Sequence, residues 1–321
     1  MSSLVHPDSI RDAAQLLRGV AVRTPLLPAD WISEAVGVEV RLKCENFQPI
    51  GAFKIRGAYT MVARLPEEAR RRGVITYSSG NHGQAVAFAA RRFGVPAVVV
   101  MPANAPEVKR EGARRLGAEV VLEGTTSLER QQRAEAIARE RGLVVVPPFD
   151  HPDIIAGQGT VGVEILEDWP DVDAILVPVG GGGLLAGIAA WIKRQRPECR
   201  VIGVEPVGAN AMRRSLDAGA PTTIESSSSI ADGLLPVRPG DLTFAHARDL
   251  VDDVITVTDE AIADATRGLI TRSRLFVEFS GAATAAALLS GAWRGDAGRI
   301  AVVISGGNLD PSRAAALLAG T

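Results

Sequence analysis

Short apolar runs alternate with longer segments of mixed polarity along most of the chain. Each run is long enough for a buried strand and too short for a buried helix. We predict strands at residues 74–77, 97–101, 118–122, 143–146, 174–179, 201–204 and 300–304. Helices are predicted over residues 84–93, closed by Gly94, from Pro106 to Gly117, and over about 127–141. Strands separated by helices of this length predict parallel sheets with right-handed crossovers.

The series of strands is interrupted once. The run Val145-Val146-Pro147-Pro148-Phe149 ends the first series, and a second series begins at Asp173. We therefore predict an α/β fold with two open parallel-sheet domains. A small domain over residues 73–148 is inserted into a large domain made of residues 1–72 and 149–321.

Composition excludes several classes of protein. Of the 321 residues, 46% are hydrophobic and 22% are charged, as in soluble globular enzymes. The formal net charge is −2 and no basic block is long enough to follow a phosphate backbone, so we expect no nucleic-acid partner. Cys44 and Cys199 lie far apart and form no metal-spaced cluster, which predicts no metal site and indicates a reducing, cytoplasmic compartment.

One uncharged stretch, residues 174–192, is nearly long enough to cross a bilayer. Four consecutive glycines, residues 180–183, lie in its middle, and their backbone groups would be unsatisfied in lipid. The N-terminus carries Asp8, Arg11 and Asp12 where a signal peptide needs an apolar run. We therefore expect a soluble protein with no membrane partner.

The first segment with chemical character runs from Glu45 to Ala58 and contains Lys54 between Phe53 and Ile55. A lysine among apolar neighbours and glycines is unlike a solvated surface lysine. Partial burial disfavours the ammonium form and leaves an amine that can attack an aldehyde. The alternative is an ordinary lysine at a helix start.

The second segment is Ser78-Ser79-Gly80-Asn81-His82-Gly83, between a predicted strand and a predicted helix. A glycine-flanked turn at a helix N-terminus presents free N–H groups, which suit a carboxylate or a phosphate. The alternative is a helix cap made by Ser79 or Asn81.

The third segment carries the four glycines Gly180, Gly181, Gly182 and Gly183 between a strand and a helix. Such a loop can wrap a phosphate with backbone donors, and we expect a side chain at Gly182 to clash with that phosphate. The spacing is not the dinucleotide pattern, and no lysine follows to make a nucleotide loop. The alternative is a tight turn with no ligand.

The fourth segment is Val303-Ile304-Ser305-Gly306-Gly307-Asn308. It places the hydroxyl of Ser305 at the end of a buried strand, where ligands bind in open α/β sheets. The alternative is a turn that only ends the strand.

The four segments, in this order, resemble the serine/threonine dehydratase and serine racemase family, which belongs to the fold-type-II pyridoxal-phosphate enzymes (tryptophan synthase β-like). Two further stretches resemble the same family, Ile155-Ala156-Gly157-Gln158-Gly159-Thr160 and residues 251–258. One such segment alone would be a weak signal, whereas four in matching order are a strong one.

The resemblance implies pyridoxal 5′-phosphate as cofactor, held by Lys54 as a Schiff base. Lys54 would then move the Cα proton of the substrate, and Ser79 would stand on the opposite face. The other residues that it implies at the cofactor are Phe53 against the ring, Asn81 at the phenolic oxygen, Gly180, Gly181, Gly182, Gly183 and the Leu184 amide at the phosphate, Ser305 at the pyridine nitrogen, and Gly233 and Glu278 along the pocket. Those that it implies at the substrate are Ser78, Ser79, Asn81 and His82.

The chain departs from the family pattern near the lysine, where Ile50 and Ala52 stand in place of two hydroxyl residues. It also reads Glu-Phe-Ser at residues 278–280, where many relatives read Glu-Pro-Thr. A cation site of many relatives uses two acids, but the position of the second is Ala211, so divalent cation binding near Glu205 should be weak. Few residues follow Asn308, so we expect no regulatory domain there.

The leading hypothesis is a pyridoxal-phosphate-dependent ammonia-lyase that removes the β-hydroxyl of an amino acid such as L-threonine or L-serine. A neutral partner such as Ser305 at the ring nitrogen favours elimination over a long-lived carbanion. An amino-acid racemase is the first alternative, and a non-catalytic phosphate-binding protein is the second. We expect a small amino acid as the substrate and a homodimer as the assembly.

Overall fold

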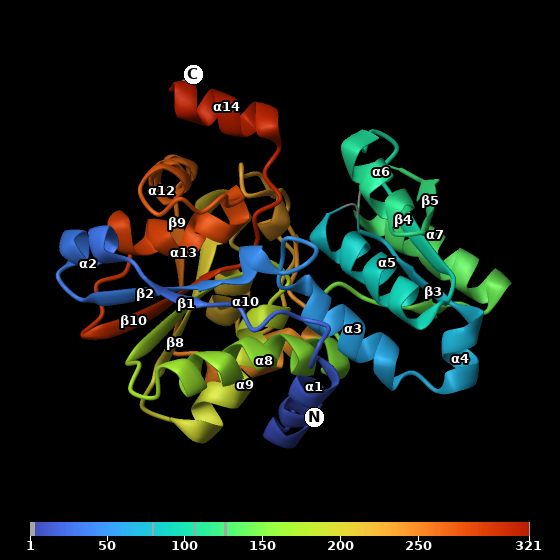
Figure 1. The fold of residues 1–321 in the computed structure, drawn as a ribbon, viewed down its shortest axis with the longest axis horizontal. Coiled ribbons are helices and arrows are strands. Elements are labelled where there is room, and N and C mark those ends of the chain that lie inside the picture. Colours follow the sequence, from blue (N-terminus) through green and yellow to red (C-terminus); the bar gives the residue numbers. More distant parts are fainter. Residues whose placement is uncertain (1–3, 79, 106, 125–126, 321) are drawn as a thin grey trace.

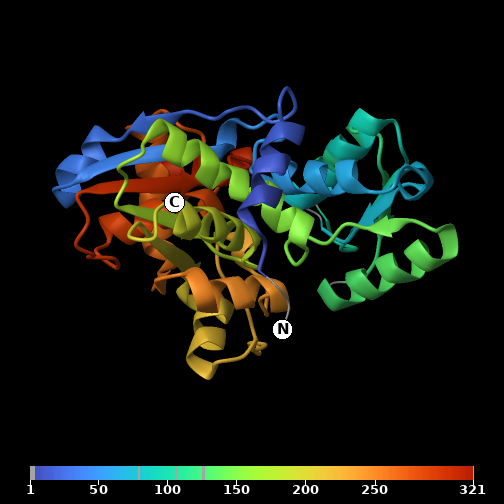
Figure 2. The same ribbon diagram turned by 90° about the horizontal axis from the view of Figure 1, so that it is seen from below.

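The computed structural model describes residues 4–78, 80–105, 107–124 and 127–320. The chain forms two units that lie side by side, each built on its own sheet (Figures 1 and 2). The predicted α/β class with two parallel sheets is confirmed. Within the described residues no helix combines the length and the apolar character needed to cross a membrane.

The larger sheet has six strands in the order β1-β2-β10-β7-β8-β9. All neighbours are parallel except β1 and β2, which are antiparallel. Its strands, in chain order, are β1 (Leu26–Pro28), β2 (Glu39–Cys44), β7 (Ala174–Pro178), β8 (Arg200–Pro206), β9 (Asp253–Val257) and β10 (Arg299–Ile304).

The smaller sheet has four parallel strands in the order β5-β4-β3-β6. They are β3 (Val74–Thr76), β4 (Ala97–Met101), β5 (Glu119–Leu122) and β6 (Val144–Val145). The helices are α1 (Pro7–Leu16), α2 (Asp30–Val36), α3 (Lys54–Arg64), α4 (Glu67–Arg72), α5 (Asn81–Phe93), α6 (Glu107–Arg115), α7 (Ser127–Arg141), α8 (Pro152–Asp168), α9 (Gly183–Gln195), α10 (Ala211–Ala218), α11 (Asp241–Leu250), α12 (Asp259–Thr271), α13 (Phe279–Leu289) and α14 (Pro311–Ala319).

The apolar strand residues are buried on both faces of the larger sheet, as a parallel sheet between helix layers requires. Side chains from α2, α12, α13 and α14 form the core on one face. Side chains from α1, α8, α9 and α11 form the core on the other. The predicted runs agree with observed strands to within two residues at each end, whereas β1, β2 and β9 were not predicted. Pro106, the predicted start of a helix, lies outside the described residues.

Helix α3 connects the two units. Its residues Ile55, Ala58 and Met61 share one apolar core with α5 and the smaller sheet. The same helix packs against α8 of the larger unit, and Figure 1 shows it between the two sheets. The predicted domain boundary at residue 73 assigns α3 to the large domain, although α3 contributes to the core of the smaller unit. The boundary therefore stays a prediction.

Glycines allow α3, α8 and α9 to approach closely. A Cβ atom on Gly157 of α8 would lie 2.5 Å from the Arg56 oxygen of α3. On the other side, a Cβ atom on Gly187 of α9 would lie 2.5 Å from the Gly159 nitrogen of α8. Helix α8 therefore holds the start of α3, which carries Lys54, in a fixed relation to α9, which follows the four glycines.

Candidate active site

Lys54 is the first residue of α3. Its Nζ donates a hydrogen bond to the Pro148 oxygen at 2.7 Å and lies 5.1 Å from the centre of the Phe53 ring. Burial lowers the pKa of this amine from 10.5 to about 8. The predicted burial of Lys54 thus favours a reactive, partly deprotonated amine.

The segment before Lys54 is hydrogen-bonded to the segment that follows β10. The Phe53 N–H donates to the Ser305 oxygen at 3.1 Å, and the Gly307 N–H donates to the Gly51 oxygen at 2.8 Å. Ala52 pairs with Gly306 in an isolated antiparallel bridge. These bonds bring the buried Ser305 next to the lysine segment, although 251 positions separate it from Lys54 along the chain.

Asn81 begins α5 and joins the smaller unit to the larger one. Its Nδ2 donates to Oε1 of the buried Glu278 at 2.7 Å. Its Oδ1 accepts from Nδ2 of Asn308 at 2.8 Å, and the same Nδ2 donates to the Ile50 oxygen at 2.9 Å. Two predicted cofactor residues, Asn81 and Glu278, are therefore in direct contact, and Asn308 is a residue to which the sequence assigned no role.

His82 is buried in the first turn of α5. Its Nε2 lies 3.0 Å from the Val146 oxygen, an acceptor, so the ring proton belongs on Nε2. Burial, and then the charge of Lys54, lowers the pKa of His82 to about 3. A neutral ring with its proton donated to Val146 cannot donate to a carboxylate, so any bond from His82 to substrate would come from its main-chain N–H.

Ser78 lies just after β3, where its Oγ accepts a long hydrogen bond of 3.4 Å from the Gly80 N–H. A Cβ atom on Gly83 would lie 2.1 Å from the Ser78 oxygen, so the turn requires glycine at that position. Ser79, the predicted residue on the far face of the substrate, lies outside the described residues.

The four glycines form the turn between β7 and α9. Gly182 has a φ angle of +92°, in the left-handed region that favours glycine, and α9 begins at Gly183. The first N–H groups of a helix, here those of Gly183 and Leu184, have no partner within it, and the helix dipole makes them attractive to an anion. The start of α9 thus has main-chain donors for an anion, and the phosphate site itself stays a prediction.

A side chain at Gly182 would clash with the protein, and the predicted clash with a phosphate stays a prediction. A Cβ atom on Gly182 would lie 2.7 Å from the Met212 Cε and 3.0 Å from the Thr243 side chain. A side chain there would therefore collide with the protein itself, whether or not a ligand is bound. The hydroxyl of Thr243 also donates to the Gly181 oxygen at 2.7 Å, which fixes the turn.

Residues 148–150 link the lysine to the glycine turn, and sequence reasoning assigned them no role. Pro148 accepts the hydrogen bond of Lys54. The Phe149 ring lies against Gly181, where a Cβ atom would be 2.1 Å from it. Asp150 accepts from the main-chain N–H groups of residues 241–243 and so caps α11.

The pocket residue Gly233 lies close to the glycine turn, since a Cβ atom on Gly180 would be 3.0 Å from the Gly233 oxygen. The Gly233 N–H donates to the Ser280 Oγ at 2.9 Å. Ser280 is one of the positions that depart from the family pattern, and its hydroxyl accepts this hydrogen bond from Gly233.

Glu205, the acid at the expected weak cation site, is hydrogen-bonded within the protein. Its carboxylate accepts hydrogen bonds from the N–H groups of Met212 at 2.9 Å and Arg213 at 2.8 Å, which caps α10. Burial raises its pKa to about 7. Over the described ranges of the chain, no group of three or more His, Cys, Asp or Glu side chains could hold a metal ion.

The residues present fit pyridoxal phosphate. The amine of Lys54, with a pKa of about 8, can bind an aldehyde. The start of α9 supplies main-chain donors for a phosphate. Pro148 and Phe149 contact the lysine and the glycine turn respectively, so the two features belong to one site.

Comparison with known proteins agrees with this fit. The family model "Pyridoxal-phosphate dependent enzyme" matches residues 17–306. The chain is 45% identical to an L-threonine ammonia-lyase of Thermotoga maritima, over 96% of this chain and 76% of that protein. A maize serine racemase structure superposes with a TM-score of 0.95 at 38% identity, covering 99% of this chain and 98% of the other.

The structure of a processed threonine deaminase from Solanum lycopersicum superposes with a TM-score of 0.91 at 36% identity, covering 99% of this chain and 96% of that one. The match to the family model spans most of the chain and includes Lys54, Asn81, the four glycines and Ser305. The chain therefore belongs to the pyridoxal-phosphate-dependent enzymes, in their fold-type-II group.

Proposed function

We propose that this enzyme is an ammonia-lyase that acts on a β-hydroxy amino acid, with L-threonine or L-serine as the substrate. The β-hydroxyl and the Cα proton leave as water, and water then hydrolyses the released enamine to a 2-oxo acid and ammonia. The similarity to an L-threonine ammonia-lyase at 45% identity over 96% of the chain supports this reaction.

The observation that carries the proposal is the joining of Lys54 and Ser305 through one hydrogen-bonded pair of segments. Pyridoxal phosphate, when bound, withdraws electrons from the substrate Cα and so makes its proton acidic. Lys54 would bind the cofactor and then hold the proton from Cα, which its pKa of about 8 allows near neutral pH. Ser305 is neutral, so it would leave the ring nitrogen largely unprotonated and favour elimination.

The remaining roles follow from the contacts. Asn81 would donate to the phenolic oxygen, and the glycine turn with the Leu184 amide would bind the phosphate. Phe53, packed beside the amine of Lys54, would contact the ring and exclude water from it. Ile50 and Ala52 are buried beside the lysine segment, and their apolar side chains offer no hydroxyl to it.

Product analysis tests the proposal. The purified enzyme with pyridoxal phosphate should convert L-threonine or L-serine to oxo acid and ammonia, and the oxo acid should exceed the D-isomer. Lys54→Ala should abolish both the turnover and the visible absorbance of the loaded protein. Lys193→Ala, at the far end of α9 in an ion pair with Asp252, is the matched control and should retain both. A Lys54→Ala protein that kept turnover would contradict the assignment.

An amino-acid racemase is the second candidate, and the close superposition on maize serine racemase favours it. Racemisation requires a group that returns a proton from the face opposite Lys54, and Ser79 is the residue proposed for it. Ser79→Ala should then suppress any D-product. D-amino acid formed by the parent enzyme in amounts equal to or above the oxo acid would favour the racemase.

We also propose a cytoplasmic homodimer. Both cysteines are buried and free, as expected in a reducing compartment. Light scattering of the loaded enzyme should give twice the mass of the 33.7 kDa chain. A mass equal to that of one chain would contradict the dimer.

A further inference from the structure

Asn308 lies at an exposed position in the loop after β10, yet its amide nitrogen makes two hydrogen bonds. One partner is the main-chain oxygen of Ile50, which can only accept a hydrogen bond. The atom of Asn308 that faces Ile50 must therefore be the amide nitrogen, and its second hydrogen points to Asn81. The Ile50 oxygen therefore fixes the orientation of the Asn308 amide, independently of any hydrogen position.

The orientation of Asn308 fixes that of Asn81. Because Asn308 presents an N–H, Asn81 must present Oδ1 to it, at 2.8 Å. The Nδ2 of Asn81 then faces the Glu278 carboxylate, an acceptor, at 2.7 Å. The Ile50 oxygen and the Glu278 carboxylate, the acceptors at the two ends of this series of hydrogen bonds, therefore favour the same orientation of both amides.

The direction has a chemical consequence. An amide nitrogen has two hydrogens, and Glu278 accepts one of those on Asn81. The other remains a donor, which suits an anionic oxygen, whereas a reversed Asn81 amide would present a second acceptor and repel it. The geometry points to Asn308 as a positioning residue that keeps Asn81 a donor toward the phenolic oxygen of the cofactor. This inference rests on the proposed function only in taking Asn81 as the residue at that oxygen.

Asn308 also contacts the lysine segment, which offers a competing explanation for its effect. Gly51 has a φ angle of +72°, and a Cβ atom on it would lie 2.5 Å from the Asn308 Oδ1. Loss of Asn308 could thus act on Lys54 through Gly51, or on the cofactor through Asn81. A double substitution separates the two routes, because an effect that passes through Asn81 disappears when Asn81 is already absent.

The experiment measures the dissociation constant of pyridoxal phosphate and the pH midpoint of the visible absorbance of the loaded protein, neither of which depends on turnover. Asn81→Ala should weaken binding about tenfold to hundredfold, the usual value of one hydrogen bond to a charged group. It should also raise the pH midpoint, because the donor stabilises the unprotonated chromophore most. Asn308→Ala should also weaken binding and raise the pH midpoint, but by less, because Glu278 still holds Asn81.

Asn308→Asp should have a larger effect than Asn308→Ala, because a carboxylate cannot donate to Ile50 or Asn81 and repels the Asn81 Oδ1 that faces it. In the Asn81→Ala background, Asn308→Ala should add no further shift. Gln195→Ala, an exposed amide at the far end of α9, is the control and should change neither quantity. If Asn308→Ala does not fold, Asn308→Ser, which keeps one donor, replaces it.

Additive shifts in the double variant, or an Asn308→Asp protein that matches the parent, would overturn the positioning role. A different result would refute the proposed function. An enzyme that binds the cofactor through Lys54 but releases no ammonia would refute the lyase, while the binding and absorbance measurements on Asn308 would still decide this inference.

Discussion

Gly157 offers the sharpest test of how the fold positions the site. Its Cα faces α3, and a Cβ atom there would lie 2.5 Å from the Arg56 oxygen and 2.6 Å from the Gly57 Cα. Both neighbours are main-chain atoms, so no side-chain rotation relieves the contact. Gly157→Ala must push α3, and Lys54 with it, away from α8.

The size of the effect follows from the distances. An ordinary carbon contact needs about 3.4 Å, so α3 must move by roughly 1 Å in a packed interior. Overpacking of this kind costs about 1–3 kcal/mol, and alanine in a helix interior returns about 0.5–1 kcal/mol relative to glycine. We expect a net loss of ~1–2 kcal/mol in the free energy of unfolding. A misplacement of about 1 Å at the reacting group can also lower turnover by ~100-fold.

Gly162, in the same helix, is the matched control. A Cβ atom there would lie 3.5 Å from the nearest atom, Ile188 Cα, which is an ordinary contact. Gly162→Ala should therefore be neutral or stabilising by up to about 1 kcal/mol, with normal turnover. Urea unfolding of the cofactor-free proteins and steady-state release of ammonia measure the two effects. A Gly157→Ala protein as stable and as active as Gly162→Ala would contradict the predicted displacement of α3.

Three further predictions concern charged groups. Because the pKa of Lys54 is about 8, the rate at which pyridoxal phosphate labels the cofactor-free protein should rise with pH up to about 8 and then level off; a rise that continues to the ordinary lysine value of 10.5 would contradict it. The raised pKa of Glu205 means that the folded protein holds a proton that the unfolded chain releases, so stability should fall as the pH rises from about 4.5 to 7. Glu205→Gln should remove that pH dependence of the free energy of unfolding in urea. A chelator should leave activity and melting temperature unchanged, because Glu205 caps a helix and Ala211 offers no carboxylate. Glu45→Gln should cost about 3–5 kcal/mol, because the buried cations Arg56 and Lys43 would then share the carboxylate of Glu164. The exposed Glu67→Gln should cost less than about 1 kcal/mol in the same assay.

Strands could be predicted where local composition and tertiary environment agree. The run at β4, Ala97–Met101, is apolar throughout and is buried throughout. Strand β2 was not predicted because Arg41 and Lys43 interrupt its apolar pattern. Lys43 is nevertheless fully buried, since its ammonium donates to the Glu164 carboxylate and the Thr24 oxygen at 2.6 Å each. No local pattern reveals a partner 121 residues away.

The same limit applies to the site. Lys54 and the glycine turn could be predicted because the residues that indicate their chemistry are adjacent in the sequence. Asp150 and Thr243 were not, because their roles exist only once α11 is placed against the glycine turn. Asn308 was part of a recognised segment, but its bond to Asn81 spans 227 positions and could not be read from the loop itself.

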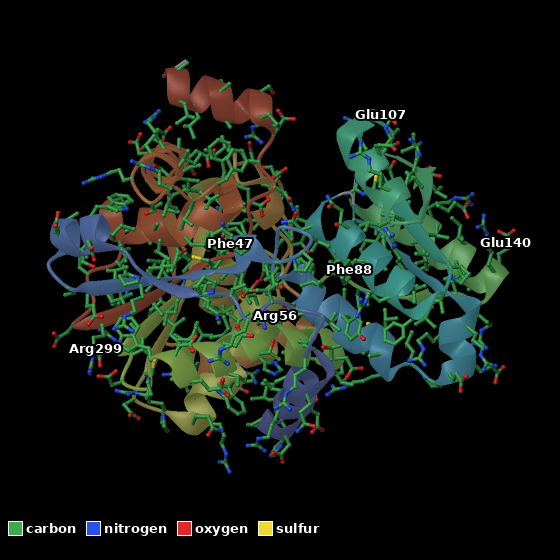
Figure 3. All side chains as sticks on the ribbon, in the orientation of Figure 1. Phe47, Arg56, Phe88, Glu107, Glu140 and Arg299 are labelled. Carbon is green, nitrogen blue, oxygen red and sulfur yellow. The ribbon has the colours of Figure 1, made fainter. Side chains whose placement is uncertain are left out.

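Arg56 shows how a residue outside the chemistry can fix its geometry. It lies two positions after Lys54, near the middle of the molecule, and its side chain is only 1% exposed (Figure 3). Its guanidinium donates to Glu45, to Glu164 and to the Thr160 hydroxyl. Five donors in a rigid plane against two carboxylates leave the start of α3 little freedom to rotate.

The stretch Ile155-Ala156-Gly157-Gln158-Gly159-Thr160 carries none of the predicted catalytic residues, yet it resembles the family. The structure supplies a physical reason. Gly157 allows α3 to pack closely against α8, and Gly159 does the same for α9. Thr160 accepts a hydrogen bond from Arg56, two positions after Lys54. A larger residue at either glycine would separate the amine from the helix start that would bind the phosphate. Both groups would hold the same cofactor molecule, so this segment of α8 would set the separation that the cofactor requires.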